Sequence, residues 1–154
     1  MTHARLQGLP DPEFQPEYYD DVPLKRLIAF VIDVFFVSVL TALTLPFTAF
    51  LGIFFFPALW FVVNLAYRII SISNSSATPG MRLAGIELRD GNGDPFTLGL
   101  AAVHTGIFVF GSSVFLLQAA SVILMLSTKR ARGLADHILG TAALNKFPTV
   151  ARAL

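Results

Sequence analysis

The chain has 154 residues, of which 55% are apolar and only 14% are charged. Soluble domains carry roughly 25% charged residues, so this composition predicts a small membrane protein. The absence of cysteine excludes disulfides, thiolate metal sites and a cysteine nucleophile, and a net charge of +1 gives no basis for nucleic-acid binding.

Residues 1–22 precede the first apolar segment and differ from it in composition. They contain three prolines and half of all the acidic residues, with few aliphatic side chains. This composition is typical of a segment that cannot form a core. We therefore predict a disordered, acidic and cytoplasmic tail.

Two apolar segments follow, residues 27–44 and 49–70, and each is long enough to cross a bilayer. Lys25 and Arg26 precede the first segment and Arg68 lies near the end of the second, whereas the linker 45–48 carries no charge. Because positive residues favour the cytoplasmic side, we predict a helical hairpin with both ends in the cytoplasm.

Residues 71–95 form a polar interior loop. Residues 86–89 alternate apolar and charged side chains, a turn sequence follows at 90–93, and residues 96–98 alternate again. This pattern predicts a short cytoplasmic β-hairpin. Residues 140–144 predict a further strand that can join it in a mini-sheet.

Residues 96–128 contain no Lys, Arg, Asp or Glu, and are too many for one upright span and too few for two. Gly111 to Ser113 predicts a break, and the basic residues at 129–132 favour a segment that enters the membrane and returns. The number of crossings stays open, and the return places the C-terminus in the cytoplasm.

The predicted fold class is an all-α membrane protein. It is a small bundle of three or four transmembrane or half-spanning helices with a cytoplasmic β-hairpin or mini-sheet. The membrane domain covers residues 23–145, and residues 146–154 form a C-terminal tail.

Asp33 is the acidic residue inside the first span, where a charge is expensive. Arg26 lies about two helical turns away, and side chains lean toward the helix N-terminus, so a direct Arg26–Asp33 bridge is not expected. We expect either a partner from another segment, such as Arg68, Arg82 or Asn64, or a protonated Asp33. Two interpretations remain open, an ion or proton site and a buried polar contact that holds helices together.

Other polar residues of the apolar segments admit two interpretations each. Asn64 either bonds between helices or contacts a substrate, and Arg68 fits an anchor that reaches the membrane surface. His104 either carries protons or lies at the membrane interface. Arg132 and Asp136 have the spacing of a helical ion pair.

No motif indicates catalysis or a bound metal. Asp90, Asn92 and Asp94 have the spacing of a calcium loop, but Pro95 and Ala101 stand where that loop needs Gly and Glu. No phosphate loop, zinc spacing or nucleophile elbow is present. We therefore expect no enzyme activity, no cofactor and no metal.

Three stretches together resemble the RDD family of membrane proteins. They are Arg26, Ala29 and Asp33 at the head of the first span, Thr-Pro-Gly-Met-Arg-Leu-Ala-Gly at 78–85, and Arg-Gly-Leu-Ala-Asp at 132–136. The resemblance covers about residues 24–145 in the family's order. It implies a multi-pass protein of the bacterial inner membrane, with transport of unidentified ligands and, for some members, sodium/proton exchange.

The chain departs from this family pattern at two places. The family's closing motif has His directly before its Asp, whereas Ala135 stands there and His137 follows Asp136. The family also tends to carry an Arg early in the third apolar stretch, where this chain has His104. If these two groups take part in transport in other members of the family, transport by this chain should differ from theirs.

Two functions follow as hypotheses. The first is an oligomeric transporter of ions or small molecules, with an unidentified ligand and the lipid bilayer and further copies of the chain as partners. The second is a non-catalytic membrane scaffold or assembly factor, whose charges lock the spans to the cytoplasmic strands. Both depend on one set of polar residues: Arg26, Asp33, Asn64, Arg68, Arg82, Asp90, His104, Arg132 and Asp136.

Overall fold

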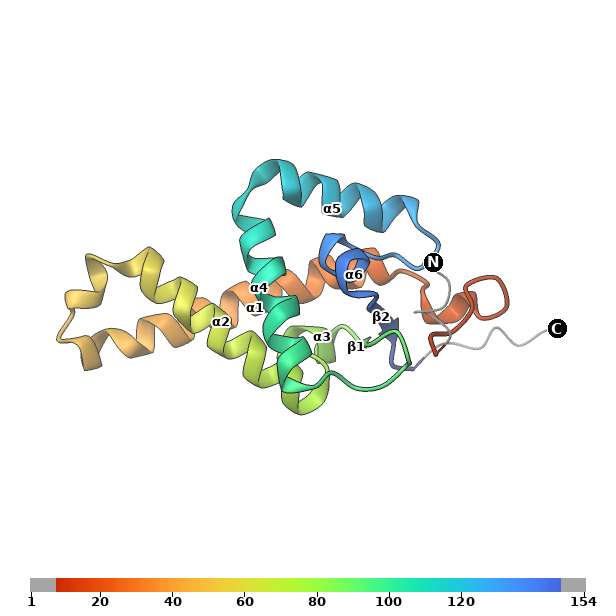
Figure 1. The fold of residues 1–154 in the computed structure, drawn as a ribbon. Coiled ribbons are helices and arrows are strands. Elements are labelled where there is room, and N and C mark those ends of the chain that lie inside the picture. Colours follow the sequence, from red (N-terminus) through yellow and green to blue (C-terminus); the bar gives the residue numbers. More distant parts are fainter. Residues whose placement is uncertain (1–7, 148–154) are drawn as a thin grey trace.

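Two long antiparallel helices form the frame of the protein (Figure 1). The computed structural model describes residues 8–147. Helix α1 (Val22–Thr44) and helix α2 (Phe56–Ser75) are about 34 Å and about 30 Å long at ~1.5 Å per residue. In the described part of the chain, two helices are long and apolar enough to cross a membrane, or three if the bent pair α4–α5 is one span.

The second span begins later and ends later than the sequence predicted. Residues 49–55 form turns and the short 3-10 helix Leu51–Ile53, with positive φ at Ala49 and Phe50. Helix α2 continues past Ile70, and within this last part the Ser73 and Ser75 hydroxyls donate to the carbonyls of Ile70 and Ser71. It ends at Ser76, whose φ is positive.

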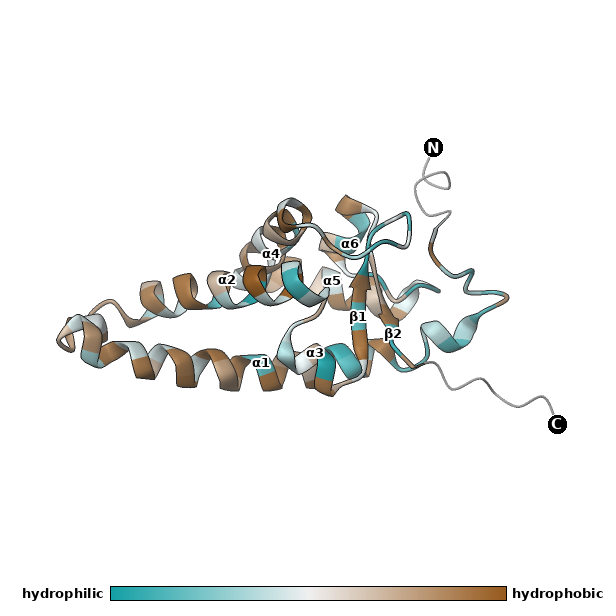
Figure 2. Cartoon of the chain, turned by 90° about the horizontal axis from the view of Figure 1, so that it is seen from below, coloured by the Kyte–Doolittle hydropathy of each residue, from teal (hydrophilic) through white to brown (hydrophobic). Residues whose placement is uncertain are grey.

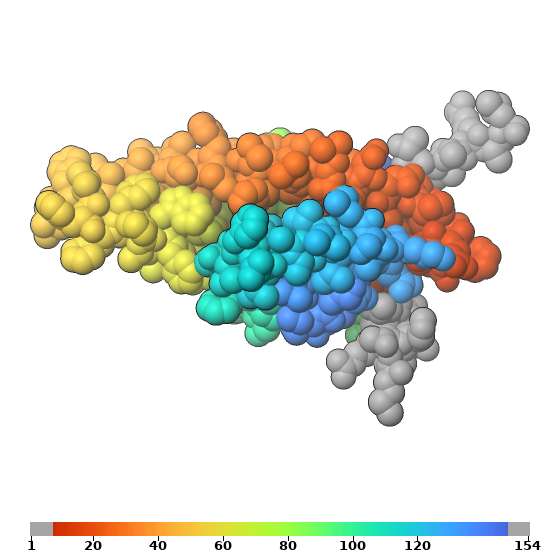
Figure 3. Space-filling model, turned by 90° about the horizontal axis from the view of Figure 1, so that it is seen from above, coloured from red at the N-terminus to blue at the C-terminus, as the bar shows by residue number. Residues whose placement is uncertain are grey.

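The third apolar segment is broken, as Gly111 to Ser113 predicted. Helix α4 (Leu98–Ser113) and helix α5 (Phe115–Ser127) meet at Val114 with a bend of 115°. Helix α4 packs on α2, and α5 packs on α1 and on the short helix α6 (Leu134–Leu139). Figure 3 shows α4 and α5 on the half of the hairpin nearest the chain's start, so the α1–α2 tip projects beyond them.

The predicted β-hairpin is wrong, but the predicted mini-sheet forms. Strand β1 (Ile86–Arg89) pairs antiparallel with β2 (Ala142–Asn145), in the register Ile86 opposite Asn145. Residues 96–98 do not pair with β1, because the Thr97 hydroxyl accepts a hydrogen bond from the Leu100 amide and begins α4 there.

The N-terminal segment differs from the solvated tail that its composition suggested. Residues 16–18 form a 3-10 helix, and Tyr19 is buried with its hydroxyl donating to the Pro10 carbonyl at 2.8 Å. The Asn145 amide donates to the carbonyls of Glu17 and Asp20, so the segment packs on β2. Two of its backbone carbonyls are thus satisfied by a side chain of the sheet. Residues 1–7 and 148–154 of the two predicted tails lie outside the described residues.

Apolar and polar surfaces are segregated along the molecule. Figure 2 shows apolar residues along the projecting α1–α2 hairpin and polar residues gathered at the opposite end. That end, here called the polar cap, consists of residues 8–21, helix α3 (Pro79–Leu83), the sheet and α6. The main buried cluster, which includes Val22, Ile72, Ile86 and Leu88, lies where the hairpin meets the cap. The protein is therefore a frame of apolar helices joined to a small polar cap.

Candidate functional site

Asp33 is enclosed by donors from α2 and from the loop that follows it. Its carboxylate accepts hydrogen bonds from the Tyr67 hydroxyl at 2.8 Å, the Thr78 hydroxyl at 2.6 Å and the Gly80 amide at 2.9 Å. Nη1 of Arg68 lies 3.6 Å from Oδ2. We call these five residues the Asp33 cluster. Arg68, one of the expected partners, does contact Asp33, whereas the other contacts were not foreseen.

The loop sequence explains how α3 reaches Asp33. Thr78 begins α3 by accepting a hydrogen bond from the Met81 amide, and Pro79 occupies the first turn, where its missing N–H has no consequence. At Gly80 a Cβ would lie 2.6 Å from Oδ1 of Asp33 and would collide with the Ala29 carbonyl. The absence of a side chain at Gly80 is therefore what lets its amide approach the carboxylate.

Arg68 is buried rather than extended to the membrane surface. Only 3% of the residue is exposed, and its guanidinium carbon lies 4.1 Å from the centre of the Phe108 ring. The predicted surface anchor is therefore wrong. Asp33 and the Phe108 ring hold this cation between α1, α2 and α4, where both attractions are strengthened by the low dielectric.

A second buried carboxylate, Asp136, joins α6 to α1 and α4. It contacts Arg26 at 2.5 Å and His104 at 3.0 Å, and accepts from the Thr141 hydroxyl at 2.8 Å and the Gly133 amide at 3.1 Å. We call these residues the Asp136 cluster. Burial by itself raises the pKa of a carboxyl group, but Arg26, His104 and Thr141 hold the pKa of Asp136 well below its usual range.

The two clusters account for five of the nine residues singled out in the sequence, and the other four lie elsewhere. Asn64 is half-buried on α2 and its side chain makes no hydrogen bond to another described residue, and Arg82 is exposed on α3. Asp90 closes a turn by accepting from two loop amides. Arg132 precedes α6, so the predicted helical pair with Asp136 does not form.

His104 is buried inside the protein. It is 2% exposed, its ring packs edge-on against Phe96, and Nε2 contacts Asp136. It therefore contacts the closing motif from the position where the family tends to carry Arg. His137, the displaced histidine, lies at the end of α6 with Nδ1 2.9 Å from the Gly133 carbonyl.

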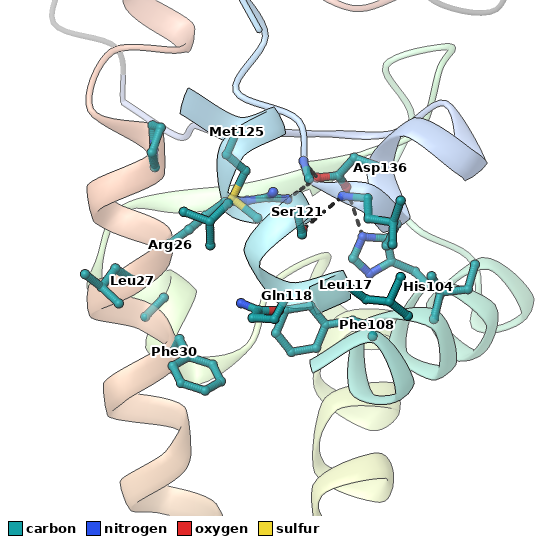
Figure 4. A pocket seen from close by; sticks show the side chains of 18 of the residues that line it. Arg26, Leu27, Phe30, His104, Phe108, Leu117, Gln118, Ser121, Met125 and Asp136 are labelled. Atoms are coloured by element: carbon teal, nitrogen blue, oxygen red, sulfur yellow. Dashed lines mark hydrogen bonds and ion pairs between the residues drawn. The ribbon is translucent and has the colours of Figure 1, made fainter. Parts of the chain in front are cut away.

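A cavity of about 440 Å³ lies between α1, α4, α5 and α6 (Figure 4). Its lining is mostly apolar and includes Phe30, Phe108 and Met125. Both clusters reach its wall, through Asp33, Arg68, Arg26, His104 and Asp136. This volume is in the range of small-molecule sites, which are mainly apolar with a few convergent polar groups.

Several residues of the site were not recognised in the sequence. They are Tyr67, Thr78, Gly80, Gly133 and Thr141 in the clusters, and Gln118 and Ser121 on the cavity wall. The sequence pattern that could have identified Gly80 is Thr-Pro-Gly, which is typical of the start of a short helix. Among residues 8–147 no group of three His, Asp or Glu side chains is arranged to hold a metal.

A helical membrane protein is the class that this fold defines, since two long apolar helices and a bent apolar pair surround buried ion pairs and meet a polar cap. Residues 22–140 match the family model described as RDD family. Because the match covers most of the chain, the protein belongs to the RDD family. No curated protein and no solved structure matches the chain.

Proposed function

We propose that this protein is a non-enzymatic transporter subunit of the bacterial inner membrane. Its substrate is a small organic molecule, and the substrate site is the cavity between α1, α4, α5 and α6. The observation that carries the proposal is the position of the cavity. It lies against both clusters, at the junction between the apolar hairpin and the polar cap.

The same geometry argues against an inorganic cation as the substrate. Asp136 uses both oxygens twice, and Asp33 accepts three hydrogen bonds beside Arg68. A carboxylate has about four acceptor positions, so little capacity remains for a metal ion. A cation would have to displace Arg26 or Arg68 and would leave a buried guanidinium unpaired, which is strongly unfavourable.

The distribution of basic residues supports a cytoplasmic polar cap. Lys25 and Arg26 begin α1, and Lys129 at the end of α5 contacts Glu13 of the N-terminal segment. The cationic ends of these apolar segments therefore lie together, and positive residues favour the cytoplasm. Because so few helices enclose little of a path across the membrane, we propose that the transporter works as a homo-oligomer.

Gly111 offers a direct test of the cavity. It lies on α4 at the cavity wall, and a Cβ built there meets nothing within 4 Å. Gly111→Leu should fill the cavity. Gly106→Leu is the matched control, because Gly106 lies on the same helix, is exposed and also has open space around it.

The measurement is native mass spectrometry of the protein purified in mild detergent. We expect small-molecule adducts on the wild-type and Gly106→Leu proteins and none on Gly111→Leu. Equal adducts on all three would overturn the cavity as the site. Sodium/proton exchange in proteoliposomes that Gly111→Leu leaves intact would overturn the small-molecule substrate.

The scaffold function remains the second candidate, because both clusters join segments distant in sequence. A scaffold predicts that Gly111→Leu and wild type support growth equally under every condition in which deletion of the gene has a phenotype. A transporter predicts that Gly111→Leu behaves like the deletion although the protein is present at normal levels.

A further inference from the structure

The polar side chains that line the cavity carry several unused hydrogen-bond donors and few unused acceptors. The carboxylates of Asp33 and Asp136 are occupied by the contacts described above. Gln118 accepts a 3.3 Å hydrogen bond from the Ser112 hydroxyl, so its amide N–H groups remain as donors. The acceptors are therefore largely used by the protein itself.

Two guanidinium groups add to these donors. Arg26 contacts Asp136 through Nη2, and a guanidinium carries five N–H donors in all. Arg68 is almost completely buried, and its Nε has no hydrogen-bond partner among the described residues. Nδ1 of the buried His104 is a further polar atom without a partner there, donor or acceptor according to its protonation.

Figure 4 shows how these groups are arranged. Arg26 reaches from α1 and Gln118 from α5 toward the space between the two helices, and His104 extends from α4 to Asp136 at the cavity wall. Buried donors without partners are unfavourable, and a ligand that offers acceptor oxygens relieves this cost. Guanidinium groups bind carboxylate and phosphate oxygens better than neutral ones because the hydrogen bonds are charge-assisted.

The remaining rim of the cavity is apolar and exposed. Leu27 and Phe30 on α1 and Val122 and Leu126 on α5 line the cavity, and all four expose 40% or more of their surface. Both helices belong to the apolar segments of the chain, so this rim faces hydrocarbon rather than water. An alkyl chain can therefore pass between α1 and α5 without leaving an apolar environment.

From these observations we infer that the cavity binds a single-chain amphiphile with an anionic, oxygen-rich head group, a carboxylate or a phosphate. The head group lies among Arg26, Gln118 and Arg68, and the alkyl chain lies between α1 and α5. The inference rests on the proposed function, since it names the substrate class of the same cavity.

The test compares four probes that share one alkyl chain and differ in the head group. Dodecanoate, dodecyl phosphate, dodecanol and dodecylamine are each titrated into the protein in mild detergent, and native mass spectrometry reports the bound fraction. We expect the two anions to bind about tenfold or more tightly than dodecanol, because a hydrogen bond to a charged group is worth more than a neutral one. Dodecylamine should bind least, and the ratio of carboxylate to phosphate binding shows which head group fits.

Gln118→Glu tests the position of the head group. The replacement keeps the size of the side chain and adds a negative charge, so dodecanoate binding should weaken about tenfold while dodecanol binding stays within about threefold. Gln118→Leu, which removes the donor and adds no charge, should give a smaller loss for dodecanoate.

The outcomes separate the two proposals. Cavity-dependent binding that prefers the anions and falls in Gln118→Glu supports the amphiphile. If all four probes bind equally, and Gly111→Leu still abolishes binding, the head-group inference is overturned while the cavity remains a small-molecule site. If no probe binds, and the wild-type adducts vanish in Gly111→Leu, the amphiphile is wrong and the proposed function stands. If Gly111→Leu changes no binding at all, both proposals fail.

Discussion

Replacing Asp33 with Asn should lower the free energy of unfolding by about 3–5 kcal/mol, because it leaves the buried Arg68 without its counter-charge. The change is nearly isosteric, so packing is preserved and the effect is electrostatic. Asp33 and Arg68 are each 3% exposed, which means that solvent screens their interaction little.

The magnitude follows from the contacts of Asp33. Its carboxylate accepts from Tyr67, Thr78 and Gly80 at 2.6–2.9 Å. A hydrogen bond to a charged group contributes about 1 kcal/mol more than a neutral one, so three bonds account for about 3 kcal/mol. The unpaired guanidinium of Arg68, 3.6 Å from Oδ2, raises the total toward about 5 kcal/mol.

Equilibrium unfolding in mixed detergent micelles, followed by circular dichroism, measures the change. Asp33→Asn combined with Arg68→Met should recover part of the loss, because the double variant has no buried unpaired cation. Asn64→Leu, on α2 like Arg68, serves as a control, since the Asn64 side chain makes no hydrogen bond to another described residue. A change within about 0.5 kcal/mol for Asp33→Asn, typical of an ordinary surface site, would refute the reasoning.

Three further predictions follow from local geometry. Gly80→Ala places a Cβ 2.6 Å from Oδ1 of Asp33, so the unfolding temperature in detergent should fall clearly, and an unchanged value would contradict the close approach. The pKa of Asp136 is held below its ordinary value of 3.8 in the folded protein. Its ionised form therefore contributes stability that is fully present above that value and is lost progressively as the pH falls below it toward the lower pKa of the folded protein. Denaturant midpoints should drop on acidification from about pH 5 to about pH 2, and Asp136→Asn should flatten the curve; equal slopes would exclude this carboxylate as the cause. Lys129→Ala removes an exposed pair with Glu13, 72% and 65% accessible, and should leave the midpoint unchanged, because water screens the attraction.

The elements with strong patterns were predictable, because hydrophobic length and charge position determine them locally. The two apolar spans, the break near Gly111 and the strand at 142–145 all follow from such patterns. The β-hairpin prediction failed because residues 86–89 and 96–98 both alternate, and alternation alone does not select a partner strand. The actual partner arrives more than 50 residues later.

The charged residues of the candidate site could be predicted from the sequence, but most of their hydrogen-bond partners could not. A buried Asp33 demands a donor from another segment, and Arg68 was foreseen on that ground. Helix geometry also excluded the direct Arg26–Asp33 bridge, and Arg26 indeed contacts Asp136 instead. Tyr67 and Thr78 were missed because a hydroxyl gives no charge signal, and its role depends on which helices come together.

The positions of the two clusters in the chain imply an order of assembly during synthesis. Every partner of Asp33 in its cluster has been made by residue 80, whereas Asp136, the ion-pair partner of Arg26, comes much later. A ribosome adds about 5–20 residues per second, so Asp136 is synthesised several seconds after the last partner of Asp33. We expect that during this interval Asp33 already joins α1 to α3, while Arg26 stays hydrated near the membrane surface. The docking of α6 then pairs Arg26 with Asp136, and strand β2, which follows α6, brings Asn145 to Lys25.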